Sequence, residues 1–170
     1  MLETQSQTEM APDIALLELE ARVDDQPAPP EGRTARFVTF YFGERLYGVP
    51  AQDVLEIAHP IPFTPLPNAP DSLLGIAPLR GEIVAVIDLK SLLGEVSSSS
   101  QRSKFVILRS ETDETASAFP VDLMHEFITL PETDFVPSSD PVPAYLSGRA
   151  SFGDAVFDIL DPRKIAAYLR

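Results

Sequence analysis

The stretch Ala77–Gly94, APLRGEIVAVIDLKSLLG, is the part of this chain whose local structure is most readily inferred. A Leu-Arg-Gly turn leads into the strongly apolar run Ile83–Ile87, and Val and Ile favour the β-strand. The run ends at Asp88, and the apolar residues of Leu89–Leu93 then suit a helical turn. A carboxylate at this point accepts the free N–H groups of a helix start, so Asp88 is predicted to cap a short helix.

Arg80 is the unusual residue of this stretch, because it lies at a tight turn between two apolar strands, next to Gly81. Its guanidinium group offers several N–H donors in a rigid plane and binds carboxylates well. One interpretation is an internal ion pair, with Glu56 or Asp88 as the partner. The other is a contact with another protein. The two roles are compatible if the ion pair shapes a neighbouring groove.

The rest of the chain is also predicted to form short strands joined by turns. It contains 17 prolines and 8 glycines, a composition that argues against long helices. Strands are predicted over residues 36–43, 46–50, 53–60, 72–81, 82–88, 104–110, 115–122, 123–131, 145–151 and 154–160. A helical turn is expected at 89–94, and a terminal helix at 161–170 with Pro162 in its first turn.

The second half of the chain repeats the first at low identity. Similar residues recur at offsets of 68 to 73 positions, and the offset changes only in loops. The pairs are Phe37 and Phe105, Val38 and Val106, Glu56 and Glu126, Ile57 and Phe127, Gly75 and Gly148, Ala77 and Ala150, Ile83 and Val156, Val86 and Ile159, and Asp88 and Asp161. The repeat predicts two similar lobes, roughly residues 34–96 and 103–170. Each holds about five short strands, which close most easily into a small barrel because closure removes exposed edges.

The composition excludes several classes of function. A net charge of −13 opposes binding to nucleic acid or anionic membranes, and the 13 basic residues are scattered. The absence of cysteine rules out disulfides and thiolate metal sites. No apolar run is long enough to span a bilayer, and the acidic first ten residues do not resemble a secretory signal. We therefore expect a globular protein with no nucleic-acid binding and no membrane insertion.

Residues 1–33 differ from the rest, because they are acidic and end in a Pro-rich hinge, DDQPAPPEGR. Within this tail, PDIALLELEARV is predicted to form one short amphipathic helix. Ile14, Leu17 and Ala21 share one face, which Leu16, Leu19 and Val23 extend. A helix of this length is marginal on its own. The segment is therefore either a partly disordered tail or a docking helix for a partner.

The sequence carries no recognisable catalytic or metal-binding motif. Neither His59 nor His125 has the spacing of a metal ligand pair, and no GxSxG or Gly-rich phosphate loop occurs. Asp88 and Asp161 end equivalent strands and are both predicted to cap the helix that follows. A hydrolase that uses one of these acids with a nearby histidine stays open as an alternative. We expect no catalytic residue, no metal and no cofactor.

Five ordered motifs in the first half carry a resemblance to a known family. They lie at Gly43/Tyr47/Gly48, Val54/Glu56/Ile57, Pro67/Asn68/Pro70, Gly75/Leu79/Arg80/Gly81 and Val86/Ile87/Asp88/Leu89. On these motifs the chain resembles the CheW-like domain family, the coupling proteins of bacterial chemotaxis, over roughly residues 34–169. The resemblance implies a mostly β fold of two pseudo-symmetric five-stranded SH3-like barrels with short helices, one of them C-terminal. This fold agrees with the internal repeat.

The resemblance also implies a non-catalytic scaffold. Members of the family bridge the cytoplasmic tip of a methyl-accepting chemoreceptor to the regulatory domain of a CheA-type histidine kinase, so a cytoplasmic protein recruited to membrane-associated receptor arrays is expected. By motif match, the partner-binding residues are Val54, Glu56, Ile57, Arg80 and Gly81. Structural turns or caps are expected at Gly75, Asp88, Gly148 and Asp161. An adaptor of a pilus-driven or other receptor–kinase array is the alternative.

The second half departs from the family pattern at Phe119 and Pro120, where small residues are common. Proline has no N–H to donate to a strand ladder. We therefore expect the strand that contains Pro120 to lie at a sheet edge or to carry a bulge.

Overall fold

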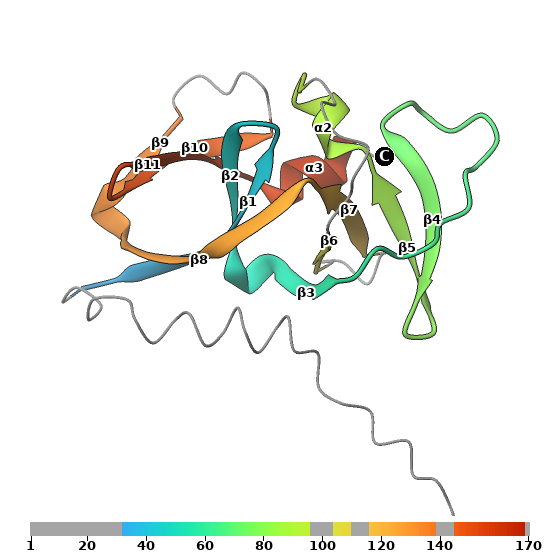
Figure 1. Ribbon diagram of the computed structural model, residues 1–170, viewed down its shortest axis with the longest axis horizontal. Coiled ribbons are helices and arrows are strands. Elements are labelled where there is room, and N and C mark those ends of the chain that lie inside the picture. The colour runs from blue at the N-terminus through green and yellow to red at the C-terminus, as the bar shows by residue number, and fades with distance from the viewer. Residues whose placement is uncertain (1–31, 96–103, 110–115, 139–144, 169–170) are drawn as a thin grey trace, which may run out of the picture.

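The computed structural model describes residues 32–95, 104–109, 116–138 and 145–168 (Figure 1). The helix predicted in the N-terminal tail lies outside the described residues. The elements are β1 (Thr34–Phe42), β2 (Arg45–Pro50), η2 (Ala51–Asp53), β3 (Val54–Ala58), β4 (Leu73–Leu79), β5 (Glu82–Ile87), α2 (Leu89–Leu92), β6 (Lys104–Leu108), β7 (Ser117–Val121), β8 (Leu123–Pro131), η3 (Glu132–Asp134), β9 (Phe135–Pro137), β10 (Leu146–Phe152), β11 (Ala155–Leu160) and α3 (Pro162–Tyr168). The sequence predicted each of these strands except β9.

The strands form two curved sheets that lie next to each other (Figure 1). The larger sheet has six strands in the order β8-β1-β2-β11-β10-β9, and the smaller has five in the order β3-β6-β7-β5-β4. Neighbouring strands are antiparallel except at two short parallel junctions, between β2 and β11 and between β5 and β7. Hairpins therefore build most of each sheet, as the short loops of the sequence suggest.

The two sheets do not coincide with the two halves of the chain. Strands β1 and β2 join β8–β11, whereas β6 and β7 join β3–β5. The first two strands of each half thus complete the sheet of the other half, and the predicted lobes 34–96 and 103–170 do not each form a sheet of their own. The repeat shows that β3 and β8 are equivalent strands with similar residue patterns. It therefore cannot show which of the two pairs with β1.

Thr39 fixes β1 against β8 at the point where their register shifts. The shift lies between Val38 and Phe40, and the Thr39 side chain is fully buried. Its hydroxyl donates to the carbonyl oxygen of Glu126 at 2.6 Å and accepts from the N–H of the same residue at 3.2 Å. The threonine side chain therefore satisfies backbone groups that a regular ladder would otherwise pair.

Replacing Thr39 by Val is expected to lower the free energy of unfolding by about 1–3 kcal/mol, because both Glu126 groups lose their partner at a buried site. Urea unfolding followed by circular dichroism measures the change. Thr39→Ser keeps the hydroxyl group and serves as the control, with most of the stability retained. Equal stability of Thr39→Val and the parent chain would contradict this role of the hydroxyl.

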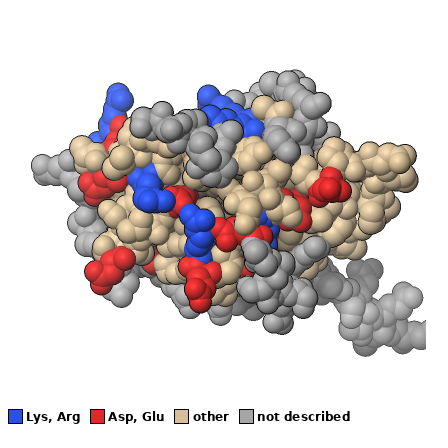
Figure 2. All heavy atoms as spheres, turned by 90° about the horizontal axis from the view of Figure 1, so that it is seen from above, with Lys and Arg blue, Asp and Glu red and all other residues tan. Residues whose placement is uncertain are grey.

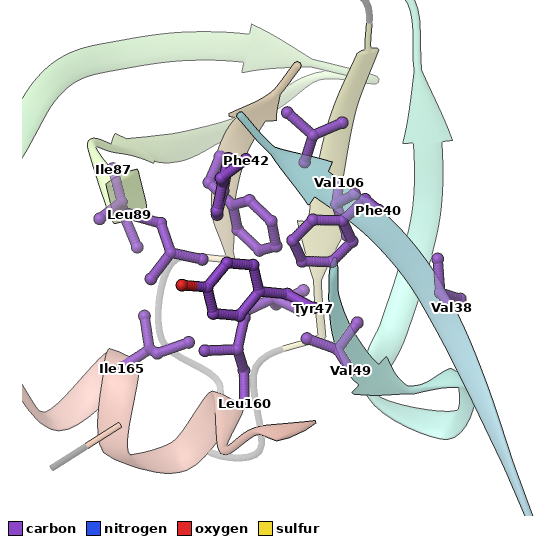
Figure 3. Close-up of a cluster of buried hydrophobic side chains, with 13 residues drawn as sticks. Val38, Phe40, Phe42, Tyr47, Val49, Ile87, Leu89, Val106, Leu160 and Ile165 are labelled. Carbon is purple, nitrogen blue, oxygen red and sulfur yellow. The ribbon is translucent and has the colours of Figure 1, made fainter. Parts of the chain in front are cut away.

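Three clusters of buried side chains form the core. The largest lies between the two sheets and takes side chains from β1, β2, β5, β6, β7, β11, α2 and α3 (Figure 3). A second cluster lines the six-stranded sheet around Phe37, Ile128 and Phe157. The third lines the five-stranded sheet around Val86 and Phe105. Because the central cluster draws on both sheets, we expect them to unfold together.

The expected edge position of Pro120 is wrong. Strand β7 lies between β6 and β5, and its pairing with β6 runs without a register shift. The parallel pairing with β5 covers only Ser117 and Ala118, so that ladder ends before the proline and needs no N–H from it. Phe119 is fully buried in the central cluster, with its ring centroid 5.4 Å from that of Phe40. Phe119 is thus a core residue and not part of an exposed surface.

Candidate protein-interaction site

Glu56 and Arg80 come together although their strands lie far apart in the sheet. Strands β3 and β4 are the two outermost strands of the five-stranded sheet, yet Glu56 Oε2 and Arg80 Nε are 2.7 Å apart. The sheet is therefore strongly curved, and Figure 1 shows the β4–β5 turn on the same side of the molecule as β3. Of the two internal partners considered from the sequence, Glu56 is the one that the structure places on Arg80.

The turn between β4 and β5 determines how Arg80 is presented. Leu79 pairs with Glu82, so Arg80 and Gly81 are the two turn residues. Their φ angles are 51° and 86°, the left-handed conformation that a two-residue type I′ hairpin turn requires. The side chain of Arg80 is 79% exposed, whereas that of Glu56 is 21% exposed. The Glu56 carboxylate thus binds Arg80 through its Nε atom, and most of the arginine side chain stays exposed and accessible to a partner.

Two exposed apolar side chains lie close in the sequence to the residues of this ion pair. Leu55 lies at the register shift of β3, and Ile83 follows the β4–β5 turn; both are exposed. Val54 and Ile57 are partly buried and pack against the central cluster. Strand β3 is therefore anchored through Val54 and Ile57, whereas Leu55 is exposed. Exposed arginine and exposed apolar side chains are both common in protein-binding surfaces.

The sequence reasoning missed Leu55 and Ile83. The exposure of Ile83 follows from the alternation of side chains along a strand. Val84 and Val86 lie on the buried face of β5, so Ile83 lies on the opposite face. Leu55 has no such signal, since its exposure depends on the register shift between Val54 and Glu56, which no local pattern indicates.

The two repeat-equivalent acids after β5 and β11 bind helix starts. Asp88 accepts hydrogen bonds from the Ser91 N–H at 3.1 Å and from its hydroxyl at 2.8 Å, at the N-terminus of α2. Asp161 accepts one from the Arg163 N–H at 3.0 Å in the first turn of α3. Both carboxylates therefore hold local structure in the described fold.

Gly75 and Gly148 occupy equivalent places in β4 and β10, each next to a register shift. A Cβ atom at Gly75 would collide with the backbone of Thr64, and one at Gly148 would lie 2.5 Å from the Val136 carbonyl oxygen. In both sheets a neighbouring segment thus crosses too closely for a side chain. These glycines are structural, and neither contributes a functional group.

A second polar network lies on the six-stranded sheet. The Tyr47 hydroxyl donates to Glu95 Oε1 at 2.6 Å, and Arg45 bridges Glu95 at 3.0 Å and Asp158 at 3.3 Å. Arg149 Nε lies 2.7 Å from the other oxygen of Asp158. Burial, and next the hydrogen bond to Glu95, raise the pKa of Tyr47 well above its usual value. The network connects β2, β10 and β11 with the segment that follows α2.

The raised pKa of Tyr47 predicts a loss of stability in alkali. The folded state favours the neutral phenol, so its contribution is complete below about pH 10 and declines as the pH rises above the pKa of an unfolded tyrosine. For one titrating group, the free energy of unfolding then falls by up to about 1.4 kcal/mol per pH unit. Urea unfolding of the parent chain and Tyr47→Phe between pH 7 and 11 measures it, and the variant should show the shallower slope. Equal pH slopes for the parent chain and Tyr47→Phe would contradict the assignment of this pH dependence to Tyr47.

Both histidines contact polar or aromatic neighbours. His59 Nδ1 lies 3.2 Å from Lys104 Nζ, while His125 stacks edge-on to Tyr41 and lies 3.3 Å from Glu126. Within the described ranges, no group of three or more acids and histidines is placed to hold a metal ion. On the face seen in Figure 2, basic and acidic side chains lie interspersed. Of the described helices, none is both long enough and apolar enough to cross a bilayer.

Two curved sheets around a shared core define a small domain of β-barrel type. The chain belongs to the CheW-like domain family, whose model matches residues 36–169. The expected fold class, mostly β with SH3-like barrels, is confirmed.

Individual relatives support this assignment. The chemotaxis protein CheW of Helicobacter pylori is 32% identical over 113 residues, which cover 66% of this chain and 65% of the relative. Protein FrzA of Myxococcus xanthus is 35% identical over 86 residues, or 51% of this chain and 47% of FrzA. The chain thus spans just under two thirds of the first relative and about half of the second. The crystal structure of the scaffolding protein TtCheW from Thermoanaerobacter tengcongensis matches with a TM-score of 0.70 at 29% identity, over 76% of this chain and 90% of that one.

Proposed function

We propose that this chain is a non-catalytic coupling scaffold that links the cytoplasmic tip of a methyl-accepting chemoreceptor to the regulatory domain of a CheA-type histidine kinase. Membership of the CheW-like family supports this role. The observation that carries it is Arg80, held by Glu56 at 2.7 Å at the tip of a hairpin and still 79% exposed. A guanidinium group with one carboxylate partner and open N–H donors is suited to take a second carboxylate from another protein.

The shape of the site suits a helical partner. A receptor tip is an α-helical hairpin, and such helices dock through an apolar ridge on one face. Leu55, next to Glu56 in β3, and Ile83, in the strand that follows Arg80, supply exposed apolar side chains. Arg80 then fixes the register of the helix through a charged hydrogen bond, which contributes more to specificity than to total affinity. Val54, Ile57 and Gly81 support the site by holding β3 and the turn in place.

The acids that an enzyme would need are engaged elsewhere. Asp88 and Asp161 cap α2 and α3, which supports a scaffold rather than a hydrolase. The proposed place of action is the cytoplasmic side of a receptor array, where the partners meet.

Isothermal titration calorimetry tests the proposal directly. The chain is titrated with the kinase regulatory domain and, separately, with a receptor-tip peptide hairpin from the same genome. Saturable binding near one-to-one to either partner supports a coupling role, and a kinase of a pilus-type array in the same genome serves as the parallel candidate. Absence of binding to every partner, singly and in the three-component mixture, would contradict the proposal.

A further inference from the structure

The outer face of β9, β10 and β11 carries a hollow of about 600 Å³. Val136 and Val156, which are 66% and 56% exposed, contribute to its lining together with Arg149 and Asp158. Solvated valines at these fractions are costly for a strand residue, so an apolar occupant would gain by covering them. The hollow is separate from Glu56 and Arg80, which belong to the other sheet.

The hollow carries an exposed arginine beside acids, because its lining includes Asp134 and Asp158 as well as Arg149. Val136 pairs with Arg149, and Arg149 pairs with Asp158 across the strands, so the three residues form one row. The side chain of Asp158 is only 9% exposed and lies between two arginines, with Arg149 at 2.7 Å and Arg45 at 3.3 Å. Both arginine side chains are more than half exposed. Each guanidinium group therefore keeps exposed N–H donors that can bind a carboxylate of another segment.

The N-terminal tail joins the fold at the edge of this hollow. The carbonyl oxygen of Arg33 accepts a hydrogen bond from the N–H of Glu132 at 3.0 Å, and Thr34 pairs with Pro131. The next residues are η3 and β9, and Asp134 and Val136 of these elements already line the hollow. Residues 24–33 span up to about 33 Å when extended, enough for the preceding segment to reach any part of the hollow.

The tail has the chemistry that the hollow accepts. Residues 14–23, IALLELEARV, contain five large apolar side chains, and residues 1–31 carry eight acids against one arginine. We propose that residues 14–23 dock in cis on the outer face of β9, β10 and β11, with their apolar side chains on Val136 and Val156 and their acids beside Arg149 and Arg45. A short tether gives an effective concentration in the millimolar range, so even weak contacts suffice.

Paramagnetic relaxation enhancement in the full chain tests the proposal. The sequence has no cysteine, so Thr8→Cys provides a single site for a nitroxide label beyond the docking segment. With the label oxidised, the amide signals of Val136, Arg149 and Val156 are expected to be at least about twofold weaker than with the label reduced. The reason is that the tether keeps the segment near the hollow at a high effective concentration. The Leu17→Asp/Leu19→Asp double variant should abolish the loss.

The matched controls use two repeat-equivalent residues. Val156→Glu removes an apolar contact in the hollow and should abolish the intensity loss, whereas Ile83→Glu, at the equivalent exposed position of the other sheet, should leave it unchanged. Uniform weak losses over the whole chain would overturn the proposal, as would losses centred on the five-stranded sheet. Losses that arise only when labelled and isotope-enriched chains are mixed would also overturn it, because they would assign the hollow to a second copy.

Discussion

Arg80→Asn is expected to weaken binding to the receptor or kinase partner at least about tenfold, a loss of roughly 1.4 kcal/mol, while the fold stays intact. Asn is favoured before Gly in a type I′ turn, and it relieves a left-handed conformation that costs other side chains about 1–2 kcal/mol. Loss of an ion pair whose arginine is 79% exposed costs at most about 1 kcal/mol. The two changes in stability offset each other, so the melting temperature reports a fold that is nearly unchanged.

Two further variants separate direct contact from an internal clamp. Arg149→Gln removes an Nε–carboxylate pair of the same 2.7 Å length from the other sheet and should leave partner binding unchanged. The charge swap Glu56→Arg/Arg80→Glu restores an ion pair within the chain but reverses the exposed charge. If Arg80 binds the partner, the swap stays defective. Recovery of binding in the swap would assign Arg80 a purely structural role, and full binding by Arg80→Asn would show that partner binding does not need the arginine.

The strands were predictable because their causes are local. Alternation and β-branched residues mark β1, β5 and β6, and the tight Leu-Arg-Gly turn marks the hairpin between β4 and β5. The partnership of Glu56 with Arg80 was predictable as one of two alternatives, because an arginine between apolar strands needs a nearby acid. Chemistry therefore restricted the choice, and only the three-dimensional fold decided between Glu56 and Asp88.

The features that could not be predicted depend on which segments meet. Thr39 looks like an ordinary strand residue, yet it bonds to Glu126, 87 positions away. The hydrogen bond of Tyr47 could not be predicted either. Tyr47 lies in β2, its partner Glu95 follows α2, and no sequence motif relates the two positions. The exchange of β1–β2 and β6–β7 between the sheets has the same origin, because two similar halves offer two self-consistent pairings. In the exchanged arrangement, strands from both halves of the chain bury their apolar side chains in one central cluster, which stabilises it.

Phe119 is a core residue at a position where the resemblance to the family predicts a small side chain. Its side chain is fully buried between the sheets, where its ring centroid lies 5.4 Å from that of Phe40 and 6.5 Å from that of Phe42. The strands around Phe119 come from both halves of the chain and also pack against other elements. They cannot easily move together to fill the cavity that a smaller side chain would leave. A large side chain therefore fills a position where the family pattern has small ones.

Phe119→Ala is accordingly expected to lower the free energy of unfolding by about 3–5 kcal/mol, a large share of the roughly 5–15 kcal/mol that stabilises a typical domain. Urea unfolding gives the change, and the slope with urea should stay constant if the two sheets still unfold together. Leu123→Ala, at an exposed strand position, is the control and should change stability by less than about 0.5 kcal/mol. A loss of less than about 1 kcal/mol for Phe119→Ala would mean that the central cluster repacks around a small residue. The departure at Phe119 would then be neutral, and the two sheets would tolerate a closer approach than their present packing suggests.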